Sequence, residues 1–307
     1  MSNLNEAAPL PTPEDANLIH RDEPWTEAAP QSDDPNKPTW GVGGALLVWF
    51  LSILLVVFMP LVFLIPYAGF KGISIGNPNY LPTLVEFATN NKTAVLLQIL
   101  ALLPTHLLTF LLVWALVTRF GRESFWSAIG WGWSRGFRLW SCIGLGVLLF
   151  FVASLLAKLI GAEKPTQLEQ LINSSLAARY AISFLAVFTA PFAEEFIYRG
   201  VLYAPLQRLA GVPGAVVIVL ALFTIIHVPQ YWPNIGVIAA VALLSIVLTV
   251  VRAYSGRLLP CIVIHLVFNG IQAALLIMEP YIHRFFPTPE QVAPTAAFLL
   301  PFFNVHF

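Results

Sequence analysis

Long apolar runs separated by short polar connections fill the chain from residue 41 onward. A helix needs about 20 apolar residues to cross the hydrocarbon core of a membrane. The pattern predicts seven such spans, over residues 41–65, 93–118, 139–160, 180–209, 214–227, 235–251 and 259–278. A last apolar stretch, 292–305, contains two prolines and is either a broken eighth helix or an interfacial segment. We therefore expect an all-α, polytopic transmembrane helical bundle of seven or eight spans.

Composition agrees with a lipid environment. Hydrophobic residues make up 58% of the chain and charged residues only 10%, whereas about 25% of a soluble domain is charged. The formal net charge is zero, so nothing indicates a nucleic-acid partner. The first 39 residues contain no apolar run and are rich in Pro, Asp, Glu and Asn, which predicts a disordered tail.

The distribution of arginine predicts the orientation in the membrane. Arginines gather in alternate connections between the predicted spans, and the intervening connections hold a thinner basic set. They are Arg119, Arg122, Arg135, Arg138, Arg199, Arg208, Arg252 and Arg257. Basic residues favour the cytoplasmic side. We expect an integral protein of a bacterial plasma membrane with its N-terminus in the cytoplasm.

The most unusual polar residues are two adjacent glutamates, Glu194 and Glu195, inside an apolar run, followed by Arg199. Ionisable groups are costly within a membrane span and usually mark a working site. Residues four apart share a helix face, so Glu195 can pair with Arg199. Glu194 then points elsewhere without a local partner, which suits a general base. The structural alternative is an ion pair that only holds helices together.

Two histidine motifs follow. Phe223 and His227 are four residues apart, so the phenyl ring can pack against the imidazole on one helix face. His265 and Asn269 have the same spacing, and both can donate hydrogen bonds to an oxyanion. His227 could instead be a buried packing residue whose ring nitrogens are hydrogen-bonded and have no part in catalysis. His265 and Asn269 could instead form hydrogen bonds that only hold neighbouring helices together.

The heights of the motifs in the membrane conflict with one another. His227 is roughly 20 Å from residue 214 by helical rise, near the far end of a short predicted span. The motifs meet only if that helix is tilted or starts outside the hydrocarbon. Pro229 and Pro233 suggest an irregular turn there. His106 follows Pro104 in the second predicted span, and we expect it to hydrogen-bond backbone freed by this proline.

In this order the three motifs resemble the CPBP family, also called the Abi or CAAX-protease-like family, which includes the type II CAAX prenyl endopeptidases. The family pattern is Glu-Glu-x-x-x-Arg, then Phe-x-x-x-His, then His-x-x-x-Asn or Asp, each on a separate membrane helix. All three motifs are intact in this chain. The likeness covers about residues 176–279, roughly a third of the sequence.

The resemblance implies a membrane-embedded endopeptidase. In the family the first glutamate and the first histidine activate a water, and these correspond to Glu194 and His227. The second histidine and the asparagine stabilise the oxyanion, which gives that role to His265 and Asn269. Structural support of the site would come from Glu195, Arg199 and Phe223. The resemblance also divides the chain into a tail (1–39), N-terminal helices (40–175), a catalytic core (176–279) and a C-terminal apolar segment (280–307).

The resemblance leaves the chemistry open between two schemes. Glu194, His227 and His265 could supply three ligands of a catalytic zinc, with water as the fourth. We favour a glutamic-type scheme without a cofactor over this metalloprotease scheme. The expected partners are the lipid bilayer and a peptide or protein substrate, either membrane-associated or prenylated like the substrates of the eukaryotic relatives.

Two non-hydrolytic functions compete with this prediction. A membrane scaffold or a bacteriocin-immunity-type protein would keep the motif residues for packing, so their substitution would destabilise the fold. A proton-coupled transporter would use the carboxylates as a relay. The sequence shows neither inverted repeats nor paired glycine-broken helices, which argues against the transporter.

Overall fold

The computed structural model describes residues 34–161 and 166–285, with side chains described as far as residue 281. Every regular element in these ranges is a helix, which confirms the all-α prediction. Besides the four helical elements between Leu176 and Tyr231, the helices are α2 (Val42–Phe70), α3 (Tyr80–Asn90), α4 (Lys92–Leu100), α5 (Leu102–Val117), α6 (Phe125–Ala128), α7 (Leu139–Ile160), α8 (Gln167–Asn173), α12 (Ile235–Ser255) and α13 (Leu259–Phe285). The predicted apolar stretch 292–305 lies outside the described residues.

Six helical segments of the described ranges are long and apolar enough to cross a membrane, so the chain is an integral membrane protein. They are Val42–Phe70, Lys92–Val117, Leu139–Ile160, Leu176–Tyr231, Ile235–Ser255 and Leu259–Tyr281. The count differs from the predicted seven or eight because two predicted spans, 180–209 and 214–227, fall within one continuous helical run, Leu176–Tyr231.

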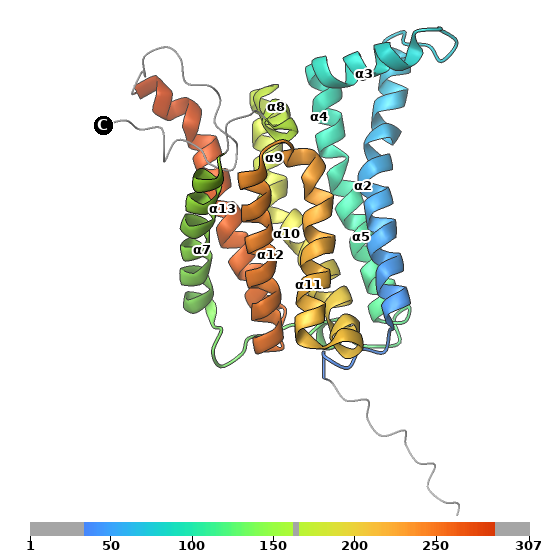
Figure 1. Cartoon of the computed structure of the whole chain (residues 1–307). Coiled ribbons are helices and arrows are strands. Elements are labelled where there is room, and N and C mark those ends of the chain that lie inside the picture. Colours follow the sequence, from blue (N-terminus) through green and yellow to red (C-terminus); the bar gives the residue numbers. More distant parts are fainter. Residues whose placement is uncertain (1–33, 162–165, 286–307) are drawn as a thin grey trace, which may run out of the picture. The chain divides into compact units, whose positions relative to one another are not determined.

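This 56-residue run is not straight. A straight helix of that length would extend about 84 Å, far beyond a hydrocarbon core of about 30 Å. The run comprises α9 (Leu176–Phe188), α10 (Ala190–Glu195), the π-helix η1 (Phe196–Leu202) and α11 (Tyr203–Tyr231). Inside α11, Gly211 has φ 69° and ψ 177°, a conformation essentially confined to glycine. Two helices meet there, and α11 reverses at its lower end in Figure 1.

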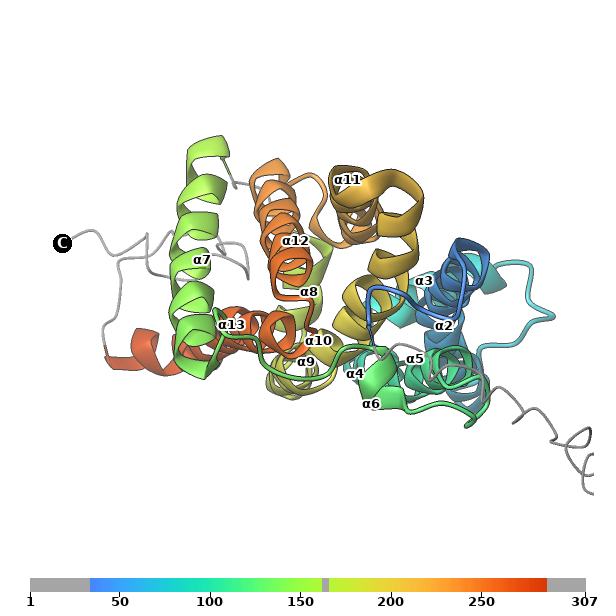
Figure 2. The same ribbon diagram turned by 90° about the horizontal axis from the view of Figure 1, so that it is seen from below.

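The long helices stand side by side in Figure 1, with α3 and α8 at the upper end. The view from below shows α12 between α7 and α11, with α9, α10 and α13 along the adjacent side (Figure 2). Glycines bring α7 close to its neighbours. A methyl group on Gly146 would lie 2.8 Å from Val267 of α13, and one on Gly236 of α12 would collide with the Ala157 carbonyl of α7. Small residues allow such close contact between membrane helices.

Residues 34–40, which we call the strap, pack against the lower end of the bundle. The Arg252 guanidinium donates to the Pro35 carbonyl and the Asn36 side chain at 3.3 and 3.0 Å. Trp40 donates from Nε1 to the Val201 carbonyl at 3.0 Å. The packed part of the chain therefore includes residues 34–39, which we expected to belong to the tail.

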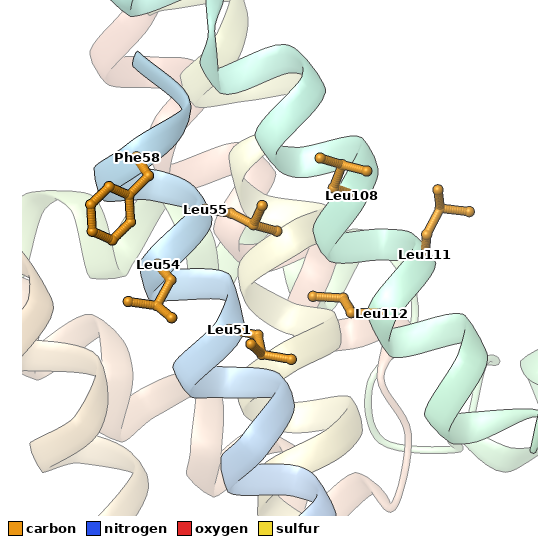
Figure 3. Close-up of a pocket in the computed structure, with 7 residues that line it drawn as sticks. All are labelled: Leu51, Leu54, Leu55, Phe58, Leu108, Leu111 and Leu112. Atoms are coloured by element: carbon orange, nitrogen blue, oxygen red, sulfur yellow. The ribbon is translucent and has the colours of Figure 1, made fainter. Parts of the chain in front are cut away.

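An apolar groove of about 490 Å³ opens between α2 and α5. Figure 3 shows its lining: Leu51, Leu54, Leu55, Phe58, Leu108, Leu111 and Leu112. No side chain in this lining can transfer a proton or donate a hydrogen bond to a carbonyl. The groove suits a hydrocarbon chain, and the chemistry must be sought among the polar residues of α10, α11 and α13.

Candidate active site

The turn at Gly211 brings the first two motifs to the same height. Glu194 lies 17 residues before Gly211, and His227 lies 16 residues after it. The two parts of the helical run on either side of Gly211, which we call its arms, therefore extend nearly equally far from the turn to these residues. The helix α11 continues through Pro229 and ends at Tyr231, and the predicted irregular turn lies at residues 232–234, around Pro233. The reversal at Gly211 removes the conflict between the membrane depths predicted for the two motifs. Glu194 and His227 lie at similar distances along the chain from the same turn.

Glu195 and Arg199 form the predicted pair, in a fully buried setting. The distance from Arg199 Nη1 to Glu195 Oε1 is 2.9 Å, and both side chains are 0% exposed. Arg199 also donates from Nη2 to the Ser245 carbonyl at 2.9 Å and to the Ser245 hydroxyl at 3.1 Å. Thr249 Oγ1 accepts from its Nε at 3.3 Å. A buried guanidinium needs this many partners to offset its lost hydration.

His265 bridges the two glutamates. Its Nδ1 lies 2.8 Å from Glu195 Oε1, and its Nε2 lies 3.8 Å from Glu194 Oε2. The two carboxylates differ in surroundings, because the Glu194 side chain is 24% exposed and that of Glu195 is 0% exposed. Glu195 is committed to Arg199 and His265, whereas Glu194 keeps an accessible face. Only Glu194 can therefore meet a water or a substrate.

His227 is held with one nitrogen available. Its Nδ1 lies 2.6 Å from the Phe223 carbonyl oxygen. A carbonyl can only accept, so Nδ1 carries the hydrogen, and Nε2 of the neutral ring has a free lone pair. The imidazole stacks on Phe223 with a centroid distance of 4.5 Å, as the spacing predicted.

Asn269 makes a hydrogen bond between two helices. Its side-chain nitrogen donates to the Ala186 carbonyl at 2.8 Å, at the end of α9. This contact matches the structural alternative, in which the carboxamide links helices. The second N–H of the amide remains as a donor, but one of the two is committed to the backbone. His265 and Asn269 do project toward the same side, onto α10 and α9.

The structure brings in residues that sequence reasoning passed over. Ser245 and Thr249 of α12 receive Arg199, and Tyr198 accepts a hydrogen bond from Trp49 Nε1 at 3.0 Å. The only signal for Ser245 and Thr249 in the sequence is the four-residue spacing of their two hydroxyls in an apolar helix. Nothing in that spacing says which helix they face.

The donor set does not fit a zinc ion in this arrangement. Within the described ranges, no three His, Cys, Asp or Glu side chains gather closely enough to hold a metal. His265 also has its Nδ1 committed to Glu195. A zinc site made of Glu194, His227 and His265 would therefore need these side chains to rearrange.

Comparison with known proteins identifies the motif region. Residues 175–271 match the family described as type II CAAX prenyl endopeptidase Rce1-like. This segment thus carries an Rce1-like domain, which confirms the resemblance seen in the sequence motifs. No curated protein and no solved structure matches the chain. Every motif residue lies inside the matched segment, whereas His106 and the strap lie outside it.

Proposed function

We propose that this chain, which carries an Rce1-like domain over residues 175–271, is an intramembrane endopeptidase. It hydrolyses a peptide bond with a water activated by Glu194 and His227. The observation that carries the proposal is the setting of one partly exposed carboxylate: Glu194 of α10 lies 3.8 Å from His265 of α13, and α11, which holds His227, packs against η1, the continuation of α10. A polar cavity between helices lets water meet a peptide bond where bulk solvent is scarce.

The roles follow from the hydrogen bonds. Glu194 accepts a proton from the attacking water as its oxygen bonds to the substrate carbonyl carbon. His227 presents Nε2 to the same water, because Phe223 holds its Nδ1. The oxyanion that forms lies near His265 Nε2, which donates to it when the ring carries a hydrogen on each nitrogen, with the second N–H of Asn269 as a further donor. The proton then passes to the leaving amine, and the carbon–nitrogen bond breaks.

Glu195, Arg199 and Phe223 support the site without touching the reacting atoms. Glu195 balances charge on His265 and fixes its orientation through the 2.8 Å contact. The guanidinium carbon of Arg199 lies 5.0 Å from the Phe223 ring centroid, within the range of a cation–π interaction. One network therefore ties the acidic motif of α10 to the histidine helix α11.

Substrate and placement belong to the same proposal. We take the substrate to be a peptide or protein at the membrane, either prenylated, as the family description indicates, or merely membrane-associated. We count the two arms of Leu176–Tyr231 as separate crossings, which makes seven. The arginine-rich connections then face the cytoplasm together with the N-terminus, in a bacterial plasma membrane.

The test is cleavage by the purified protein in proteoliposomes. The probes are a farnesylated peptide ending in Cys-aliphatic-aliphatic-X and the same peptide without farnesyl, besides a set of membrane-protein fragments. We expect Glu194→Gln and His227→Ala to lower kcat by about 100- to 10,000-fold. Glu86→Gln, an exposed glutamate of α3, is the matched control and should cleave like the wild type. Wild-type rates in Glu194→Gln would refute the hydrolase.

The scaffold alternative predicts another pattern. It expects no cleavage of any probe by the wild type and a loss of stability in both Glu194→Gln and His227→Ala. The zinc scheme is tested separately, by the metal content of the active protein and by treatment with a chelator. We expect less than one metal ion per chain and full activity after chelation. Stoichiometric zinc, with activity restored only by zinc, would contradict the metal-free scheme.

A further inference from the structure

The direction of Glu194 is set at the break between α9 and α10. Helix α9 ends at Phe188, and α10 begins at Ala190. The residue between them, Thr189, has φ −128° and ψ −46°, which is not helical. Glu194 lies only five positions after Thr189. A small rotation at this break would therefore swing the carboxylate away from His227 and His265.

The Thr189 side chain does not cap α10, although it occupies the N-cap position. Its hydroxyl donates instead to the Leu185 carbonyl at 3.1 Å, back into α9. A threonine hydroxyl has one hydrogen, so its oxygen remains an acceptor for another donor. That donor comes from a helix outside the motif region.

His106 of α5 supplies it. Its Nδ1 lies 2.8 Å from Thr189 Oγ1. With the hydroxyl hydrogen directed to Leu185, the ring nitrogen is the donor in this contact. The expectation that His106 serves backbone freed by Pro104 was therefore wrong, because its partner is a side chain on another helix.

The break is held from two sides. Asn269 of α13 donates to the Ala186 carbonyl at 2.8 Å, three residues before Thr189. His106 of α5 holds Thr189 itself. Helix α5 contacts both α10 and η1, so it is a wall of the site although it lies outside the matched segment 175–271.

We propose that His106 is a positioning residue of this site: by donating from Nδ1 to Thr189 it fixes the α9–α10 break and thereby the direction of Glu194. The expected effect on kcat rests on the proposed function. The expected effect on the conformation of the α9–α10 break rests only on the hydrogen bonds described above. A helix that contains none of the three motifs, α5, thereby helps to position the candidate active site.

The experiment uses the geometry of the imidazole. The amide nitrogen of an asparagine reaches about the position of Nδ1, so His106→Asn keeps the donor to Thr189, whereas His106→Ala and Thr189→Val remove the bond. We expect kcat to fall by about 10- to 100-fold in His106→Ala and Thr189→Val, with KM within about twofold of wild type. His106→Asn should recover kcat to within about threefold, and the double variant should be no worse than either single one.

The matched control is Thr105→Val, which removes a hydroxyl of the same helix that bonds the Ala101 and Leu55 carbonyls at 2.9 and 3.5 Å, neither of which lies at the α9–α10 break. A second readout needs no activity: hydrogen exchange of the backbone amides of 190–194. We expect faster exchange in His106→Ala and Thr189→Val and wild-type exchange in His106→Asn and Thr105→Val. This readout stands even if no probe is cleaved, so the two proposals can fail separately.

Three outcomes would overturn the inference. Unchanged exchange in His106→Ala would show that the ring does not hold the break. Wild-type kcat in an active His106→Ala protein would show that the break does not matter for catalysis. Equal kcat losses in His106→Asn and His106→Ala would show that Nε2, not Nδ1, is the nitrogen that the reaction needs.

Discussion

The two adjacent glutamates of this protein differ in their exposure and in their contacts. Glu195 is 0% exposed and contacts Arg199 and His265 through one oxygen, whereas Glu194 is 24% exposed. Successive helical residues point about 100° apart, so one side chain faces the packed interior and the other faces the gap between the arms. Stability and chemistry are thereby divided between adjacent positions.

This division predicts opposite phenotypes. Glu195→Gln leaves Arg199 without its buried counter-charge, and breaking such a pair costs about 3–5 kcal/mol. Glu194→Gln removes no close ion pair of a buried guanidinium, and the unfolding free energy should change by less than about 1 kcal/mol. Reversible unfolding in mixed micelles measures both. Equal losses of stability in the two variants would show that Glu194 is also a structural residue.

At the scale of the elements, departures from the regular α-helix shape the site. The break at Thr189, the π-helix η1 and the reversal at Gly211 all occur between residues 189 and 211. A π-turn exposes backbone groups and is frequent at functional sites. Here the carbonyls of Arg199 and Val201 accept from Arg252 Nε at 3.1 Å and from Trp40 Nε1 at 3.0 Å. Side chains of other elements thus satisfy the irregular backbone.

Helix α7 offers a prediction on packing. Gly146→Ala would place a methyl group 2.8 Å from Val267 of α13, whereas Gly144→Ala meets nothing within 4 Å. Overpacking costs about 1–3 kcal/mol, while alanine is the better helix former by about 1 kcal/mol. We expect Gly146→Ala to lower the melting temperature and Gly144→Ala to leave it equal or higher. The same change in both would contradict the close approach of α7 and α13.

At the scale of the whole described chain, the strap links the N-terminal segment to the site helix. Arg252 is 0% exposed and joins the strap residues Pro35 and Asn36 to the Arg199 carbonyl. The described ranges give it no salt-bridged carboxylate. Its charge depends instead on carbonyl oxygens and on the Tyr203 ring, whose centroid is 5.4 Å away. The strap is thus part of what keeps η1 in place.

Trp40 tests this link. Trp40→Phe keeps an aromatic ring but removes the donor to Val201, and we expect the unfolding free energy to fall by about 1 kcal/mol. Trp140→Phe is the control, because Trp140 is 79% exposed and should leave stability unchanged. Limited proteolysis should also cut faster near residue 40 in Trp40→Phe. Identical stability in both variants would mean that the Trp40 bond does not hold the strap.

The sequence predicted much of the local order. Apolar runs located the membrane helices, and the four-residue spacings predicted the Glu195–Arg199 pair and the stacking of Phe223 on His227. Such features depend on neighbours along one helix, whose geometry is nearly fixed. The ends were less predictable: Gly211 carries the reversal that we placed between residues 209 and 214, and α11 runs past Pro229.

By itself, then, the sequence determined that the chain crosses a membrane as helices and that its few polar residues there fall into three motifs. Tertiary structure alone decided which helices face one another. It joined Ser245 to Arg199, Asn269 to Ala186 and His106 to Thr189. These contacts span from 46 to 83 residues along the chain. Helical periodicity specifies a face but not its partner, since lipid and another apolar helix are nearly equivalent surroundings for the same residues.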